Sequence, residues 1–132
     1  MRFVLITAIG GVLAACSSTP ADLEAKAPPI VETYSENYQE IYRRVSSTAK
    51  RCLAGNVNAY ASMAVDSELY SELGYAEISL SLINVGTRNY YWTAKIEKVD
   101  RSARMTVRAG NTLAKDNLIE SALRWARGDT NC

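Results

Sequence analysis

Tyr75-Ala76-Glu77-Ile78-Ser79-Leu80-Ser81-Leu82 is the stretch that decides the fold class of this chain. Apolar and polar side chains alternate strictly along it, with Ala76, Ile78, Leu80 and Leu82 on one side and Glu77, Ser79 and Ser81 on the other. A period of two is typical of a strand with one buried face and one face in water. The stretch therefore predicts an antiparallel sheet with one open face.

Neighbouring segments supply further strands. Residues 57–65 read as a less regular strand and residues 66–74 as a loop. After a turn at residues 84–88, a third strand has an inward face of Tyr90, Trp92, Ala94 and Ile96. A fourth follows residues 100–102, with Met105, Val107 and Ala109 inward. The preferred register places Glu77 beside Lys95 and Glu97 beside Arg104, because opposite charges on adjacent strands stabilise a sheet by a few tenths of a kcal/mol.

Two helices are expected to flank the strands. Thr33-Tyr34-Ser35-Glu36 has the form of a capping box, so the first helix is predicted to begin at Thr33. Its apolar stripe is Tyr34, Tyr38, Ile41, Tyr42, Val45, Ala49 and Cys52. The second helix is predicted over residues 115 or 116 to 127, capped by Asp116 or Asn117 and ended by Gly128. The predicted fold is α+β, a two-layer sandwich in which both helices cover one face of an antiparallel sheet of 3–4 strands.

Two surfaces are candidates for binding. The open sheet face would carry Ser79, Ser81, Tyr91, Thr93, Lys95, Arg104, Thr106 and Arg108, which suits a polar polymer or a partner protein. A merely solvated sheet explains the same pattern. The basic end of the first helix, with Arg43, Arg44, Lys50 and Arg51, could meet lipid A phosphate or a peptidoglycan carboxylate, although these cations also complement the helix dipole.

Composition removes most catalytic chemistries. The chain has no histidine, which rules out Ser-His-Asp and Cys-His catalysis and the usual zinc sites. Ser47-Thr48-Ala49-Lys50 matches the Ser-x-x-Lys signature of penicillin-recognising enzymes, but their other motifs are missing. A carboxylate pair drawn from Glu68, Glu72 and Glu77 stays open as the basis of glycoside hydrolysis. We expect no enzyme activity, no cofactor and no metal.

The amino terminus carries an export signal. Met1-Arg2 precedes a mostly apolar run over residues 3–13, which is too short to span a bilayer as a helix. Leu13-Ala14-Ala15-Cys16 resembles the bacterial lipobox. The resemblance implies cleavage before Cys16, a diacylglyceryl thioether on its sulfur and an acyl chain, palmitate for example, on its new amino group. The alternative is an ordinary signal peptide cut near Ala15, which leaves Cys16 as a thiol.

The signal divides the chain into three parts: a signal peptide over residues 1–15, a lipidated tether over 16–32 and one α+β domain over 33–132. Because Ser17 rather than Asp follows Cys16, the resemblance to lipoproteins implies the outer membrane, with the domain facing the periplasm or, alternatively, the cell surface. Cleavage removes Arg2 and leaves equal numbers of basic and acidic residues. That balance argues against nucleic acid as a partner.

The cysteines predict one disulfide. With Cys16 lipidated, Cys52 and Cys132 are left in an oxidising compartment and can pair in only one way.

Further motifs carry a family resemblance. The lipobox, Leu73-Gly74-Tyr75, Arg88-Asn89-Tyr90-Tyr91-Trp92 and Gly128-Asp129-Thr130-Asn131-Cys132 together resemble small uncharacterised outer-membrane lipoproteins of proteobacteria. The resemblance implies a location and a fold, and no activity. Three functions follow as hypotheses: a non-catalytic envelope module that binds a protein or cell-wall partner, a small inhibitor of host cell-wall hydrolases similar to lysozyme inhibitors, and a Glu-dependent peptidoglycan-cleaving enzyme. The oligomeric state stays open.

Overall fold

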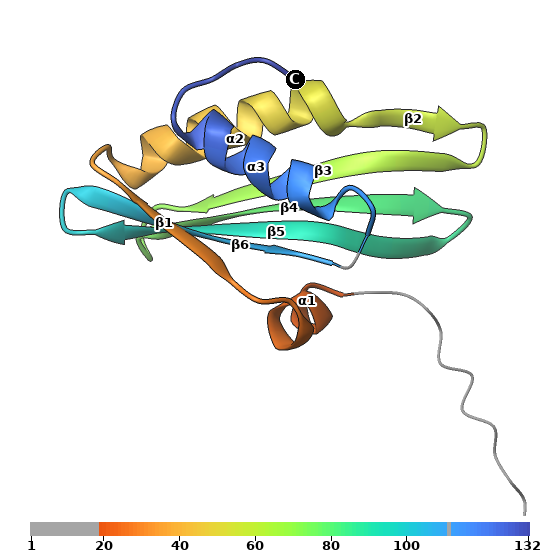
Figure 1. The fold of residues 1–132 in the computed structure, drawn as a ribbon, viewed down its shortest axis with the longest axis horizontal. Coiled ribbons are helices and arrows are strands. Elements are labelled where there is room, and N and C mark those ends of the chain that lie inside the picture. Colours follow the sequence, from red (N-terminus) through yellow and green to blue (C-terminus); the bar gives the residue numbers. More distant parts are fainter. Residues whose placement is uncertain (1–18, 111) are drawn as a thin grey trace, which may run out of the picture.

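An antiparallel sheet forms the middle of the molecule (Figure 1). The computed structural model describes residues 19–110 and 112–132. The signal peptide and Cys16 therefore lie outside the described residues. The strands lie in the order β1-β6-β5-β4-β3-β2. Their bounds are Ile30–Tyr34 for β1, Gly55–Asn58 for β2, Ala61–Tyr70 for β3, Tyr75–Asn84 for β4, Thr87–Val99 for β5 and Ser102–Ala109 for β6.

The α+β class and the antiparallel sheet are as predicted, but six strands replace the expected 3–4. The additional strands are short and lie at the two edges, β1 against β6 and β2 against β3. The preferred register is confirmed, because Glu77 pairs with Lys95 and Glu97 pairs with Arg104.

The strand predicted over residues 57–65 is in fact a hairpin, and its second arm is longer than expected. β3 pairs with β4 without interruption from Ala61 opposite Asn84 to Tyr70 opposite Tyr75. Residues 66–70, predicted as a loop, therefore belong to a strand. Their side chains are mostly polar and exposed, so this part of the strand lacks the alternation of apolar and polar residues that predicts a strand.

A bulge corrects the predicted inward face of β5. Leu80 pairs with Trp92 while the next residue, Ser81, pairs with Tyr90, so Tyr91 is an extra residue in β5. One extra residue reverses the alternation beyond it. Trp92, Ala94 and Ile96 are buried as predicted, whereas Tyr90 lies opposite Ser81 rather than with the inward set.

Two helices cover one face of the sheet. They are α2, Tyr38–Leu53, and α3, Lys115–Ala126 (Figure 1). The predicted stripe of α2 is confirmed at Tyr38, Ile41, Val45 and Ala49, which are all buried. They pack with Trp92, Trp125, Ile78, Leu80, Ile96 and Met105 in one core. Complete burial of a side chain as large as Ile41 contributes about 1.5–3 kcal/mol before entropic costs.

The first helix begins later than predicted, whereas α3 begins at Lys115, as predicted, with a different cap. Thr33 and Tyr34 close strand β1, and α2 starts four residues later behind Asn37, whose side chain accepts a hydrogen bond from the Gln39 amide at 2.8 Å. The Thr33 capping box is therefore wrong: the non-local pairing of β1 with β6 prevails over the local signal. Ala114 occupies the cap of α3 and makes no side-chain cap bond, so neither Asp116 nor Asn117 is the cap.

A further helix covers part of the opposite face. α1, Pro20–Lys26, lies across β5 and β6 on the side away from α2 and α3 (Figure 1). Leu23 is its buried anchor, with 4% of its surface exposed. Arg108 donates from Nη1 to the carbonyls of Glu24 and Ala27 at 3.2 and 2.8 Å, which holds the C-terminal end of α1. Most of the predicted tether over residues 16–32 is thus part of the folded domain.

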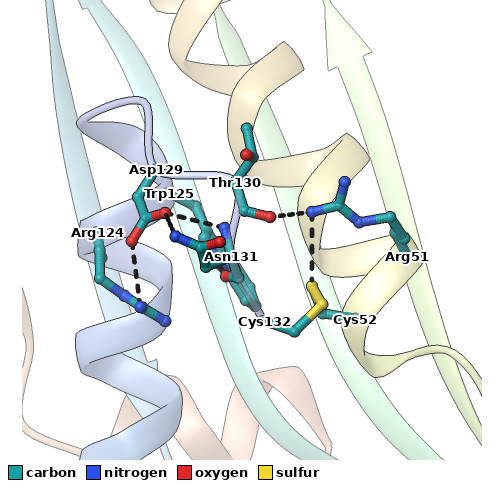
Figure 2. The surroundings of a disulfide bond; sticks show 8 residues. All are labelled: Arg51, Cys52, Arg124, Trp125, Asp129, Thr130, Asn131 and Cys132. Carbon is teal, nitrogen blue, oxygen red and sulfur yellow. Dashed lines mark hydrogen bonds and ion pairs between the residues drawn. A yellow bond between two sulfur atoms is a disulfide. The ribbon is translucent and has the colours of Figure 1, made fainter.

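The predicted disulfide between Cys52 and Cys132 is present and joins the end of α2 to the C-terminus (Figure 2). The two Cα atoms are 5.3 Å apart. The tail is also held by Trp125, whose indole nitrogen donates to the carbonyl of Asn131 at 2.8 Å, and by a hydrogen bond from Arg51 to the carbonyl of Thr130. The C-terminal residues are therefore fixed to both α2 and α3.

Candidate functional site

The open sheet face contains a groove beside α1 with a volume of about 430 Å³. Strands β3 to β6 form its floor, and Pro20 and Glu24 of α1 form one wall. Its neutral lining consists of Ser67, Ile78, Ser79, Thr93, Ala94 and Thr106, together with Pro20. The groove exists because α1 covers only part of the sheet face and leaves the rest open.

Acidic side chains outnumber basic ones along the groove. The lining includes Glu24, Asp66, Glu68, Glu77 and Glu97, against Lys95 and Arg108. Asp66 pairs with Arg88 at 2.9 Å, and Glu97 pairs with Arg104 at 3.3 Å and with Lys95 at 3.8 Å. Arg108 is occupied by the carbonyls of α1. The cations near the groove are thus mostly engaged.

Glu68 and Glu77 form the least compensated part of the groove. They are direct partners across β3 and β4, and both are exposed. Neither forms an ion pair among the described residues. Like charges placed opposite each other destabilise a sheet by a few tenths of a kcal/mol or more. The same negative charge raises the pKa of Tyr70, although burial of the phenol makes the larger contribution.

An aromatic pair borders these carboxylates. The rings of Tyr70 and Tyr75 lie 4.8 Å apart between centroids and are tilted by 32°. The ammonium of Lys95 lies 4.9 Å from the centre of the Tyr75 ring, which is a cation–π distance. This end of the groove therefore offers an apolar surface next to negative charge.

Five of the eight residues predicted for the binding face line the groove: Ser79, Thr93, Lys95, Thr106 and Arg108. The other three do not. Ser81 is completely buried, Tyr91 packs half-buried against the core at the bulge, and Arg104 is exposed outside the lining.

Sequence reasoning missed the α1 wall and the acidic side of the groove. A signal for α1 is present: Thr19-Pro20-Ala21-Asp22 has a cap residue, proline at the first helical position and an acid at the third. In the structure the Thr19 hydroxyl accepts from the Asp22 amide at 3.1 Å, and the Asp22 carboxylate accepts from the Thr19 amide at 2.8 Å.

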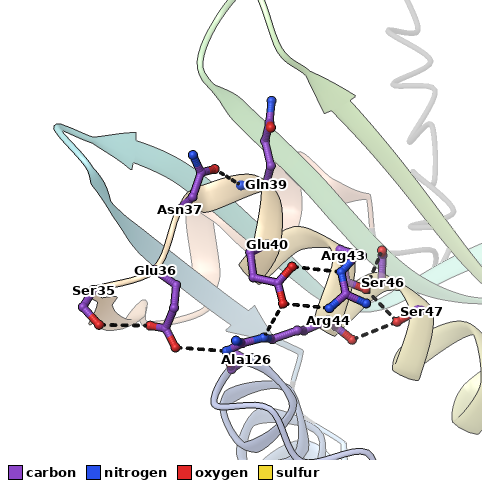
Figure 3. Close-up of polar contacts among 10 residues, drawn as sticks. All are labelled: Ser35, Glu36, Asn37, Gln39, Glu40, Arg43, Arg44, Ser46, Ser47 and Ala126. Atoms are coloured by element: carbon purple, nitrogen blue, oxygen red, sulfur yellow. Dashed lines mark hydrogen bonds and ion pairs between the residues drawn. The ribbon is translucent and has the colours of Figure 1, made fainter.

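The second predicted surface, the basic end of the first helix, is largely engaged within the domain (Figure 3). Arg43 pairs with Glu40 at 2.7 Å, and Arg44 pairs with Glu40 and Glu36 at 2.9 and 3.1 Å. Arg44 also donates to the carbonyl of Ala126, which links α2 to α3. Hydrogen bonds from Arg43 and then Arg44 lower the pKa of Glu40 to about 2. These arginines stabilise the helix pair and are poorly placed to meet an anion.

The groove presents polar and charged groups beside apolar ones. It offers hydroxyls, carboxylates and one ammonium on a rigid sheet, which can hydrogen-bond a ligand and orient it. In the part of the chain that the structure describes, no three metal-ligating side chains of the His, Cys, Asp or Glu type come together. Over the same residues, none of the helices has the length and apolar character needed to cross a bilayer.

Comparison with known proteins gives no family for this chain. No protein-family model matches it, and no curated protein is significantly similar to it.

Proposed function

We propose that this chain is a lipid-anchored, non-catalytic module of the bacterial cell envelope that binds an envelope protein or a peptidoglycan partner in the groove of its open sheet face. The anchor is the lipid on Cys16, the location is the outer membrane and the domain faces the periplasm. Binding needs no cofactor and no metal.

The groove beside α1 is the observation that carries this proposal. One face of the sheet is covered by α2 and α3, whereas α1 covers the other only in part and leaves a groove of about 430 Å³. Glu68 and Glu77 lie opposite each other and form no ion pair among the described residues, although Lys95 is the other neighbour of Glu77, and a purely structural sheet does not require this arrangement. A partner that presents amino or guanidinium groups would relieve their repulsion, so a basic protein segment or an amine-bearing wall peptide fits best.

The disulfide supports the location. A bond between Cys52 and Cys132 persists in the periplasm and is rare in a reducing cytoplasm. It agrees with export through the lipobox, because a chain retained in the cytoplasm would keep both thiols reduced.

Site-specific photocrosslinking in cells tests the proposal. A photoreactive amino acid replaces Thr93, in the floor of the groove, in the full chain, and crosslinked products are identified by mass spectrometry. The same residue placed at Arg101, in the β5–β6 turn outside the groove, is the control. We expect a discrete envelope product from position 93 that disappears when Glu68→Lys and Glu77→Lys are added. Equal products from both positions, or none from position 93, would contradict the proposal.

One observation favours a second candidate, a Glu-dependent peptidoglycan-cleaving enzyme: Glu68 and Glu77 are direct cross-strand neighbours. However, both side chains are exposed, whereas the acid of such an enzyme needs a raised pKa, which burial usually supplies. Release of muropeptides by the purified protein, abolished by Glu77→Gln, would establish this function instead of the first.

A further inference from the structure

We propose that the end of the sheet formed by the β2–β3 and β4–β5 turns faces the lipid bilayer and seats its exposed apolar side chains in the headgroup region. This inference rests on the proposed lipid anchor at Cys16. It adds an orientation: the domain lies against the membrane by this end.

Large apolar side chains gather at this end without packing against the domain. Tyr60 and Val85 each have 77% of their surface exposed, and Leu113 is fully exposed. The amide of Val85 donates to the carbonyl of Tyr60 at 3.3 Å, which joins the two turns. Ala109, at the end of β6, pairs with Trp92 and so lies in the same half of the sheet as these turns. Two joined turns thus expose apolar side chains at this end, and the exposed Leu113 follows β6 in the chain.

These segments are also free of charge. No acidic or basic residue occurs in residues 54–65, 78–87 or 109–114. The opposite end of the sheet is different, because its turns contain Glu72, Asp100 and Arg101. Inserting a charge among lipid headgroups and upper acyl chains is costly, whereas Tyr is enriched there. The two ends are therefore suited to different surroundings.

The backbone at Val85 gives a second indication. Its φ is +40°, in the left-handed region that a β-branched residue rarely adopts. Tight hairpin turns normally place Asn, Asp or Gly there. Among the described residues, nothing buries this valine to offset the strain. A contact of Val85 with a surface outside the domain would account for an apolar side chain that is both exposed and held in a strained backbone conformation.

The anchor is attached close to the sheet. α1 lies under the middle of the sheet (Figure 1), and a Cβ atom added at Gly110, just beyond β6, would lie 3.2 Å from Leu23. Cys16 precedes Thr19 by three residues, and three residues span at most about 11 Å. A lipid on Cys16 would therefore hold the domain close to the bilayer, so that one of its surfaces faces the lipid.

Depth-dependent fluorescence quenching tests the orientation. Processed full chain, purified from bacterial membranes, is reconstituted in phosphatidylethanolamine and phosphatidylglycerol vesicles with brominated acyl chains. Tyr60→Trp reports on the proposed end, and Leu73→Trp, at a side chain 70% exposed in the opposite turn, is the matched control. Wild-type protein supplies the background, since Trp92 and Trp125 are buried. We expect bromolipid to quench Tyr60→Trp about threefold or more above Leu73→Trp, because an interfacial ring lies close to the upper acyl chains.

Vesicle flotation separates the two possible failures. If wild-type protein does not float with the vesicles, the lipid anchor is wrong and the proposed function fails with this inference. If it floats but the two variants are quenched equally, only the orientation is wrong. If the protein floats, forms a crosslinked dimer, and the Trp of Tyr60→Trp is shielded from bromolipid in that dimer, a second copy covers this end. The orientation is then wrong as well.

Discussion

At the scale of single residues, Tyr34 at the end of β1 is a buried phenol with 7% of its surface exposed. Burial raises its pKa well above the ordinary 10, and the negative charge of Glu32 adds to the shift while Arg127 opposes it. Because the folded-state pKa is raised, the stabilisation is complete below about pH 10 and is lost as pH rises above it. The Tyr34 hydroxyl has no hydrogen-bond partner among the described residues, so we expect Tyr34→Phe not to lower stability at pH 7 and to unfold at a higher pH than wild type. Alkaline unfolding followed by circular dichroism measures this, and identical curves would contradict it.

Ser81 is the second residue with an unusual environment. It is completely buried on the α1 side of the sheet, and its hydroxyl has no hydrogen-bond partner among the described residues. A buried unsatisfied hydroxyl costs about 1–3 kcal/mol. We therefore expect Ser81→Ala to raise the free energy of unfolding by about 1 kcal/mol, and Ser79→Ala, on the same face in the groove, to leave it unchanged. Denaturant unfolding of both variants checks this, and a clear loss of stability in Ser81→Ala would refute it.

At the scale of elements, α1 is the part of the fold most easily displaced. It has seven residues and a single buried large side chain, Leu23. So short a helix has little stability of its own, and Leu→Ala at a buried site costs about 2–5 kcal/mol. We expect Leu23→Ala to detach α1 and raise hydrogen exchange at the Leu23 and Ala27 amides about tenfold or more, while β4 and β5 amides stay protected. Lys26→Ala, an exposed change in the same helix, is the control. Unchanged α1 exchange in Leu23→Ala would show that other contacts hold it.

Elements were predictable where local pattern and burial agree. The alternation of β4 and the stripe of α2 gave their inward faces, and the charges gave the register. Elements that depend on distant partners were missed. β1 has only one strongly buried side chain, Tyr34, and owes its structure to hydrogen bonding with β6.

The β5 bulge at Tyr91, opposite Leu80 and Ser81, is one reason why the site was predicted only in part. One inserted residue in β5 changes which side chains share a face, and no composition signal marks it. The groove itself could be predicted only in part: Lys95, Thr93 and Ser79 follow from alternation, but the α1 wall required a short helix to be recognised inside an apparent tether.

At the scale of the whole molecule, the disulfide joins parts that are 80 residues apart in sequence. Closing so long a loop removes unfolded-state entropy worth about 4.5 kcal/mol in the simple chain model. We expect the double variant Cys52→Ser, Cys132→Ser to lose about 2–4.5 kcal/mol of unfolding free energy, measured by urea titration. Wild type under reducing conditions should lose a similar amount. A loss below about 1 kcal/mol would mean that Trp125, Arg51 and the helix contacts already fix the tail without the bond.

The proposed anchor, groove and uncharged end are compatible with one another. If a lipid on Cys16 holds the domain at the bilayer and the end containing Tyr60 and Val85 faces the lipid, the groove opens on the sheet face, at a different part of the surface. In that arrangement a partner could enter the groove while the domain stays at the membrane.

Intact mass spectrometry of the protein purified from bacterial membranes is the measurement that tests this account most directly. We expect a chain that begins at Cys16, carries a diacylglyceryl group and an amide-linked acyl chain on that residue, and has no free thiol at Cys52 or Cys132. A chain with an unmodified Cys16 thiol, or one that retains residues 1–15, would contradict the lipid anchor and with it the placement of the domain on the membrane.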